Sequence, residues 1–148
     1  MIDELSGREL NRAIAKALGW KAELRRHRGM LWAALMGPDG TLIGKEMPLW
    51  GVYANGNPEH AFSQTPDWAH DANAALELCY QWAVEHGKDI MVRPKDDGLC
   101  QAVFMRSDYE HFEYWEPFLD IGWHRGKTPA EVLARLALAA LKLGAVAE

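Results

Sequence analysis

The spacing of apolar and polar residues along the chain predicts helical segments that alternate with short strands. A first helix is expected over about residues 7–18, because Ser6 and Glu9 form a capping box and apolar residues then recur every three to four positions. A second is expected to begin near residues 67–71, where acidic side chains suit the positive end of a helix, and to stop at residues 86–87.

The third helix has the clearest boundaries. Thr128 is expected to cap it, Pro129 occupies its first turn, Glu131 completes a second capping box, and Gly144 follows its apolar stripe. The chain therefore has three predicted helices.

Between the helices, the pattern predicts strands. Residues 21–28 and 30–36 are separated by a break at Gly29, and residues 41–44 return as a hairpin partner. A second hairpin is expected from residues 89–93 and 99–105.

Two stretches are less regular. Residues 45–66 have no sustained period, which leaves a functional loop and an unrecognised strand pair both open. More strand is expected between residues 109 and 123. Because strands and helices do not alternate regularly, the fold class is expected to be α+β with a mostly antiparallel sheet.

Composition favours one ordinary globular domain over residues 1–148. Hydrophobic residues make up 49% and charged residues 25% of the 148 positions, which is the usual balance for a folded domain. The two cysteines, Cys79 and Cys100, lack the spacing of a metal site and are expected to be free thiols, which fits a cytosolic protein.

The charge and the absence of long apolar runs exclude some partners. A net charge of −5 argues against binding to duplex nucleic acid, which requires many cationic contacts with phosphates. No apolar run reaches the roughly 20 residues that a membrane helix needs, and residues 1–4 are acidic where a signal peptide would be basic. We expect neither membrane insertion nor secretion.

Three segments together resemble the phage ABA-sandwich domain proteins, which are small proteins of tailed phages and prophages. They are RELNRAIAKALGW at 8–20, PDWAHDANAA at 66–75, and TPAE at 128–131 with its Ala-rich continuation to Leu141. They are similar to the family's first helix ending in Gly-Trp, its Pro-x-Tyr/Trp-x-x-Asp-x-x-Ala-Ala helix start, and its last helix. The chain departs from the family at His70, where a small hydroxyl residue is common.

The resemblance implies a phage or prophage origin, the cytoplasm of an infected bacterium as location, and an α-β-α sandwich of three helices on a mostly antiparallel sheet. It implies no enzymatic activity and supplies no catalytic residues. Some small phage proteins of similar size sequester the signalling nucleotides of bacterial immune systems without cleaving them. By that analogy of fold and origin, the groups of interest in this chain are those that could bind a nucleotide.

Aromatic residues are the first candidates for such a site. The chain has seven Trp, and four aromatic residues, Trp50, Tyr53, Phe62 and Trp68, fall in or beside the irregular central stretch. A base can stack on such rings. The alternative is that these rings pin a long loop onto the domain or fill a dimer interface.

Cationic residues are the second candidates. Arg26 and Arg28 share one face if residues 21–28 form a strand, and they could clamp phosphate; an edge strand protected by charge is the alternative.

A second cationic segment, His124, Arg125, Lys127 and Thr128, precedes the last helix. Its helix start could contact an anion, but it is one residue short of a phosphate-loop motif, and a solvated loop with Thr128 as a simple cap is the alternative.

Metal and catalytic sites are not expected. The pair His70-Asp71 is better explained by helix capping than by metal binding, because no second His-containing partner has suitable spacing. A solvated strand face is a better explanation than a catalytic carboxylate pair for the acidic stretch that contains Glu110-His111, Glu113 and Glu116. We therefore expect no metal, no cofactor and no catalytic residue.

These observations lead to one main hypothesis and two rivals. The chain is expected to be a non-enzymatic, homo-oligomeric binding protein that captures a small nucleotide-type ligand, such as a cyclic nucleotide or an ADP-ribose derivative, through loop aromatics and Arg or Lys. The first alternative is a phage protein that inhibits a host or phage protein through a Trp-rich surface. The second is a small hydrolase that uses the region of His70-Asp71 or Glu110-His111.

Overall fold

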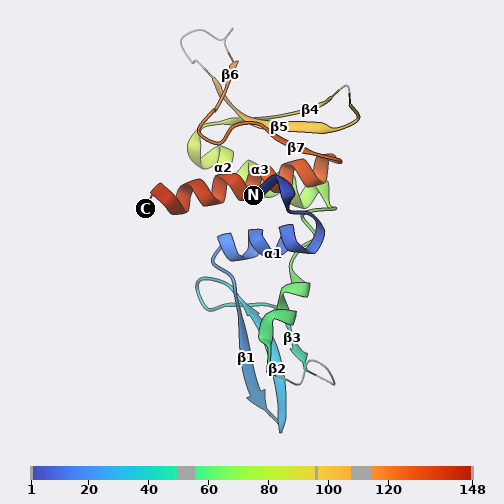
Figure 1. Ribbon diagram of the computed structural model, residues 1–148. Coiled ribbons are helices and arrows are strands. Elements are labelled where there is room, and N and C mark those ends of the chain that lie inside the picture. The colour runs from blue at the N-terminus through green and yellow to red at the C-terminus, as the bar shows by residue number, and fades with distance from the viewer. Residues whose placement is uncertain (1, 50–55, 96, 108–114, 148) are drawn as a thin grey trace. The chain divides into compact units, whose positions relative to one another are not determined.

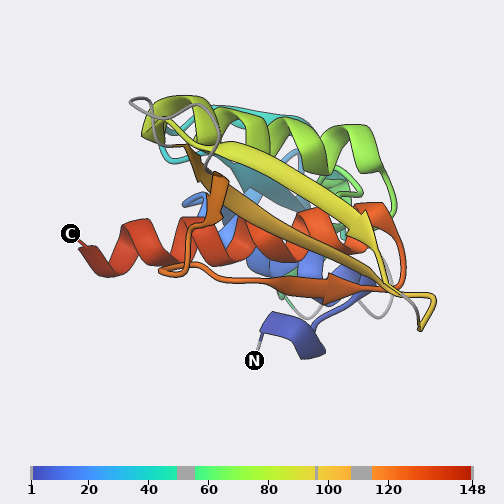
Figure 2. The same cartoon turned by 90° about the horizontal axis from the view of Figure 1, so that it is seen from above.

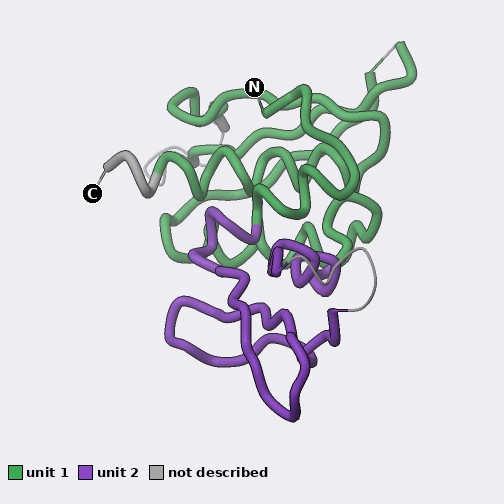
Figure 3. The backbone as a smooth tube through the Cα atoms, turned by 60° about the horizontal axis from the view of Figure 1, so that its bottom comes forward, with its two compact units in different colours: residues 1–14, 67–148 green, residues 15–66 purple. Residues whose placement is uncertain are grey.

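The computed structural model describes residues 2–49, 56–95, 97–107 and 115–147. The chain divides into two compact units, residues 1–14 with 67–148 and residues 15–66 (Figure 3). Both units contain antiparallel sheet together with helix, which confirms the α+β class. The single domain and the α-β-α sandwich stay predictions.

The first unit contains an antiparallel sheet with two long helices on one of its faces (Figures 1 and 2). Strand β5 (Cys100–Ser107) pairs with β4 (Asp89–Pro94) along one edge and with β6 (Trp115–Pro117) and β7 (His124–Gly126) at opposite ends of its other edge. The helices of this unit are η1 (Ile2–Glu4), the first residues of α1 (Gly7–Ala17), α2 (Ala72–His86) and α3 (Pro129–Ala147).

Capping side chains set the helix boundaries. The carboxylate of Asp71 accepts hydrogen bonds from two backbone amides in the first turn of α2, and Gly87 ends that helix in a left-handed conformation. At the start of α3, Thr128 Oγ1 accepts a hydrogen bond from the amide of Glu131 at 3.1 Å. The three predicted helices are therefore confirmed, with ends that differ by a few residues.

The two long helices bury the inner face of the sheet. The ring of Trp82 on α2 lies 4.4 Å from that of Phe104 on β5, and Cys79 Sγ donates a hydrogen bond to the carbonyl oxygen of Leu133 on α3 at 3.1 Å. Burial raises the pKa of the Cys79 thiol to about 12. Since side chains alternate along a strand, Ala102 and Phe104 face the helices and Gln101 faces away.

The second unit is a three-stranded antiparallel sheet in the order β1-β2-β3 with a short helix packed against it. Its elements are β1 (Lys21–His27), β2 (Met30–Met36), β3 (Leu42–Pro48) and the 3-10 helix η3 (Pro58–Gln64). Both hairpin strands predicted before residue 37 are confirmed.

Strand β3 is longer than the sequence predicts, and the reason is a bulge at Gly44. This glycine has φ +71°, a conformation that costs other residues energy, and the pairing of β2 with β3 shifts register beside it. The backbone of Lys45 then exchanges hydrogen bonds with the side chain of Gln64 on η3. The described part of the irregular stretch is thus the end of a strand followed by a 3-10 helix.

A close approach of β7 to α3 makes the identity of residue 126 critical for stability. A Cβ at Gly126 would lie 2.7 Å from the backbone nitrogen of Val132, closer than real contacts allow. We expect Gly126→Ala to lower the free energy of unfolding by about 1–3 kcal/mol, because the strand or the helix must shift.

Urea unfolding followed by circular dichroism measures this cost. Arg125→Ala, on the same strand but with an exposed side chain, is the matched control and should change stability little. Equal stability of Gly126→Ala and the wild type would contradict the packing described.

Candidate functional site

The outer face of the first unit's sheet, which faces away from α2 and α3, carries two arginines, a glutamine and a tryptophan. Arg93 on β4, Gln101 on β5 and Arg125 on β7 are directly opposite one another in the strand register, and Trp123 comes just before β7. Directly opposite residues of paired strands lie on one face of a sheet. We call these four residues the Arg–Trp face.

Arg93 is held in place by two neighbours. Its Nε and Nη2 atoms donate hydrogen bonds to Gln101 Oε1 at 3.3 and 3.2 Å, and its Cζ atom lies 4.4 Å from the centre of the Trp123 ring. Gln101 is only 6% exposed, whereas Arg93 is exposed. A guanidinium fixed on a ring and an amide loses less conformational entropy when it binds a ligand than a free one does.

Arg125 supplies a second exposed cation on the other side of Gln101. Neighbouring strands are about 4.8 Å apart, so the backbones that carry the two arginines are roughly 10 Å apart across the buried Gln101. Neither Arg93 nor Arg125 forms an ion pair with a carboxylate of the described residues. The Arg–Trp face is therefore a cationic patch with an aromatic ring, within a chain of net charge −5.

The opposite side of β7 is fixed by a buried network around Arg135 of α3. Its guanidinium donates from Nε and Nη2 to the carbonyl oxygen of Leu5 at 3.1 and 2.9 Å, and from Nη1 to the carbonyl oxygen of Arg125 at 2.7 Å. Nη1 also lies 3.2 Å from Glu131 Oε1. The hydrogen bond from the guanidinium of Arg135, on the α3 side of the sheet, thus fixes the backbone position of Arg125.

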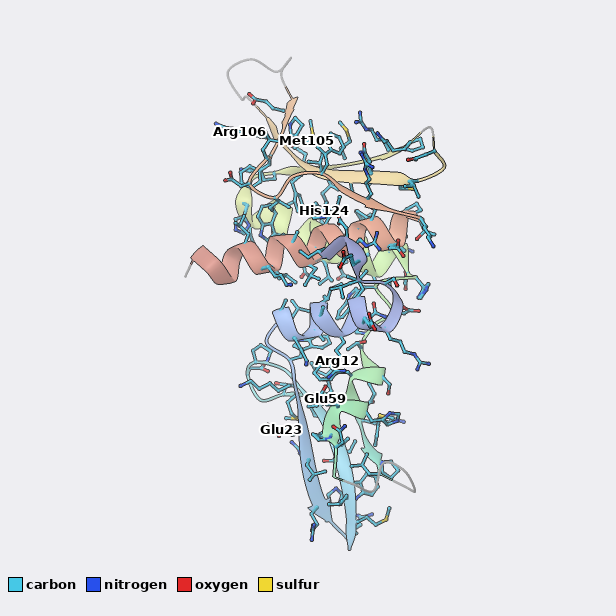
Figure 4. All side chains as sticks on the ribbon, in the orientation of Figure 1. Arg12, Glu23, Glu59, Met105, Arg106 and His124 are labelled. Atoms are coloured by element: carbon cyan, nitrogen blue, oxygen red, sulfur yellow. The ribbon has the colours of Figure 1, made fainter. Side chains whose placement is uncertain are left out.

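His124 points away from the Arg–Trp face and has a partner of its own, Asp3. It is 9% exposed, and its side chain lies between the sheet and α3 (Figure 4). Its Nδ1 atom is 3.0 Å from Asp3 Oδ1, and among the described residues its buried Nε2 atom has no hydrogen-bond partner. The prediction that His124 contacts a ligand beside Arg125 is corrected, because strand alternation puts the two side chains on opposite faces.

At the start of α3, groups of the protein occupy the positions proposed for an anion. Glu131 Oε1 accepts a hydrogen bond from the backbone amide of Lys127 at 3.1 Å, and Thr128 caps the helix. A carboxylate already lies where the positive helix end would attract a phosphate. Lys127 and Thr128 are exposed, and capping explains Thr128 without a ligand.

The other predicted ligand contacts lie elsewhere. Trp68 is 3% exposed, so the expectation of an open stacking ring is wrong there; Trp50 and Tyr53 lie outside the described residues. Arg26 and Arg28 are exposed in the second unit, on β1 and in the turn that follows it. They belong to a different compact unit from Arg125.

His70 and Asp71 have structural partners. Asp71 caps α2, and His70 Nδ1 lies 2.9 Å from Asp67 Oδ1. Over residues 2–49, 56–95, 97–107 and 115–147, no group of three or more His, Cys, Asp or Glu side chains is arranged to hold a metal ion. Glu110, His111 and Glu113 lie outside these ranges.

Sequence reasoning identified Arg125 but missed Arg93, Gln101 and Trp123 as part of the same site. The hairpin of residues 89–93 and 99–105 was predicted, and its register is what brings Arg93 opposite Gln101. The three-residue strand β7 was not predicted because it is too short to show a period. Without β7, nothing in the sequence links Arg125 to Arg93.

No protein-family model matches the chain, and neither a curated protein nor a solved structure matches it. None of the helices formed by the described residues has an apolar stretch long enough to cross a bilayer. What the protein does must be inferred from its own side chains.

The buried network predicts that Arg135 is essential for the stability of the first unit. We expect Arg135→Met to lower the free energy of unfolding by about 3 kcal/mol, because Glu131 and two carbonyl oxygens lose a buried cationic donor. Urea denaturation measures this loss. Lys142→Met, at an exposed position on the same helix, is the control, and a similar small effect of both changes would argue against the network.

In the second unit, Arg25 and His27 act on one carboxylate. Hydrogen bonds from Arg25 and His27, at 2.8 and 2.7 Å, lower the pKa of Glu46 below its ordinary value. A lowered folded pKa stabilises the fold above the ordinary value of the carboxyl group, and this contribution is lost as the pH falls through the folded pKa.

We expect Arg25→Ala to move the titration of Glu46 up toward the ordinary range, because the largest cause of the lowered pKa is removed. The carboxyl carbon shift of Glu46, followed by NMR against pH, measures it. Arg26→Ala is the matched control, because residue 26 points to the other face of β1. An unchanged titration in Arg25→Ala would contradict the pairing.

Proposed function

We propose that the protein binds a small nucleotide-type ligand on the Arg–Trp face and does not convert it chemically. The observation that carries this proposal is the Arg93 guanidinium held over the Trp123 ring by Gln101, with Arg125 on the other side of Gln101. An anionic ligand with a flat ring system is the chemistry that such a surface recognises.

The recognition has two parts. A base stacks on the planar Arg93 guanidinium or on the Trp123 ring, which contributes about 1–3 kcal/mol per base. Phosphate oxygens accept hydrogen bonds from Arg125 and from the Nη1 group of Arg93, each worth about 1.5–3 kcal/mol. Gln101 keeps Arg93 in the orientation that both interactions need.

The biological setting of the proposal comes from the resemblance to phage ABA-sandwich domain proteins. In that setting the protein acts in the cytoplasm of an infected bacterium, as a homo-oligomer that sequesters a nucleotide-derived immune signal. The acidic chain repels long polyanions, whereas the local cationic patch attracts a small one.

Native mass spectrometry and thermal shift with cyclic nucleotides and ADP-ribose derivatives test the proposal. We expect a bound ligand that is recovered intact after heat denaturation. Arg93→Ala and Arg125→Ala should each weaken binding by about tenfold or more, since each removes a charge-assisted contact. Arg106→Ala, an exposed arginine on β5 outside the Arg–Trp face, is the matched control and should bind as the wild type does.

Other outcomes of the same binding experiments distinguish the rival functions. Preference for a single-stranded oligonucleotide over free nucleotides would assign the same chemistry to a polymer. Degraded ligand would indicate a hydrolase. If no nucleotide shifts the melting temperature, or if Arg93→Ala and Arg125→Ala bind as the wild type does, the proposal is wrong.

A further inference from the structure

Helix α2 of the first unit carries a line of large apolar side chains that face solvent. Leu76, Tyr80 and Val84 are 43%, 63% and 62% exposed. They are four residues apart, so they lie along one side of the helix. The buried side of α2 consists of Ala75, Cys79 and Ala83, so the exposed residues are not part of the core. We call Leu76, Tyr80 and Val84 the α2 stripe.

The α2 stripe stands out from the rest of the described surface. Exposed large hydrophobic residues among the described positions are Leu24, Leu42, Leu76, Tyr80, Val84, Val92 and Leu119, and three of these seven form this one line. Single exposed apolar residues are ordinary, but a contiguous line on a helix is typical of a surface that another helix covers.

Acidic residues border the stripe on one flank. Glu77 follows Leu76 and Glu85 follows Val84, so both project from the same side of the line. Both are exposed, and neither forms an ion pair within the described residues. Helix α2 has no Lys or Arg, and its last residue is His86. An occupant of the stripe therefore meets unneutralised negative charge.

The geometry points to the α2 stripe as the docking site for an amphipathic helix of another protein, whose apolar side is bordered by Lys or Arg. Its apolar residues cover Leu76, Tyr80 and Val84, and its cations pair with Glu77 and Glu85. Tyrosine is a frequent anchor at such interfaces, and Tyr80 is at the centre of the line.

A second copy of the chain fits this surface poorly. In a twofold antiparallel pairing centred on Tyr80, Leu76 of one copy meets Val84 of the other. The same rotation keeps both acidic flanks on one side and brings Glu77 of one copy near Glu85 of the other. Like charges at such a seam are destabilising, which favours a basic partner over self-association.

The docking site is independent of the proposed nucleotide site. The Arg–Trp face is on the sheet face that turns away from α2, and it shares no residue with the α2 stripe. Failure of one proposal therefore leaves the other standing.

The test uses displayed helical peptides in which apolar positions are fixed at helical spacing and the flanking positions are random. We expect selection on the wild-type protein to enrich Lys and Arg at the flanks. The best peptide should bind Tyr80→Ala about tenfold more weakly, because a central aromatic anchor is lost. Glu77→Lys with Glu85→Lys should invert the preference toward acidic flanks.

Three controls make the result decisive. Glu9→Lys, an exposed charge reversal on α1, should leave peptide binding unchanged, and unfolding midpoints establish that every variant is folded. Arg93→Ala with Arg125→Ala should also leave it unchanged. The proposal is wrong if no peptide is enriched, or if the enriched peptides have neutral or acidic flanks. It is also wrong if light scattering shows a dimer that the Tyr80→Glu variant no longer forms.

Discussion

The buried guanidinium of Arg135 connects three parts of the first unit. It donates hydrogen bonds to the carbonyl oxygen of Leu5 just after η1 and to that of Arg125 on β7, and it pairs with Glu131 one turn earlier on α3. Burying a cation is costly unless hydrogen-bond acceptors surround it. Here the acceptors come from three places in the chain: the carbonyl oxygens of Leu5 and Arg125 and the carboxylate of Glu131. Each element therefore depends on the others being in place.

That constraint determines what the sheet presents to solvent. With its carbonyl oxygen bonded to Arg135, Arg125 has its backbone fixed, and strand alternation sends its side chain to the open face while His124 turns inward to Asp3. The close contact of Gly126 with Val132 fixes the same strand from the helix side. The position of Arg125 beside Gln101 is thus a consequence of packing beneath the sheet.

Local signals were sufficient to predict most of the elements. Capping residues such as Asp71 and Thr128 act within one turn, so the helix starts could be predicted from sequence. The strand that was predicted to end at residue 44 continues through a bulge at Gly44, because a bulge glycine and a turn glycine have the same local signature in the sequence.

The candidate site required information that sequence does not contain. Arg93 and Arg125 are 32 positions apart, and only the pairing of β7 with β5 brings them to one row. The side chain of Trp68 is of a type that can stack on a base, but tertiary packing buries it, and no local sequence pattern predicts that burial.

The Arg–Trp face of the first unit is cationic, whereas the α2 stripe is apolar and bordered by the acidic residues Glu77 and Glu85. The Arg–Trp face is cationic within an acidic chain, and this is why a small anion, rather than a long polyanion, is the ligand proposed for it. The acidic border of the α2 stripe has the same sign as the net charge of the chain, so the basic helix proposed for this surface would be attracted both by the net charge and by Glu77 and Glu85. A ligand and a protein partner chosen by these rules do not compete for the same residues. Any coupling between the two sites has to pass through the packing of α2 and α3 against the sheet, which includes the contact of Trp82 with Phe104 and the elements that Arg135 connects.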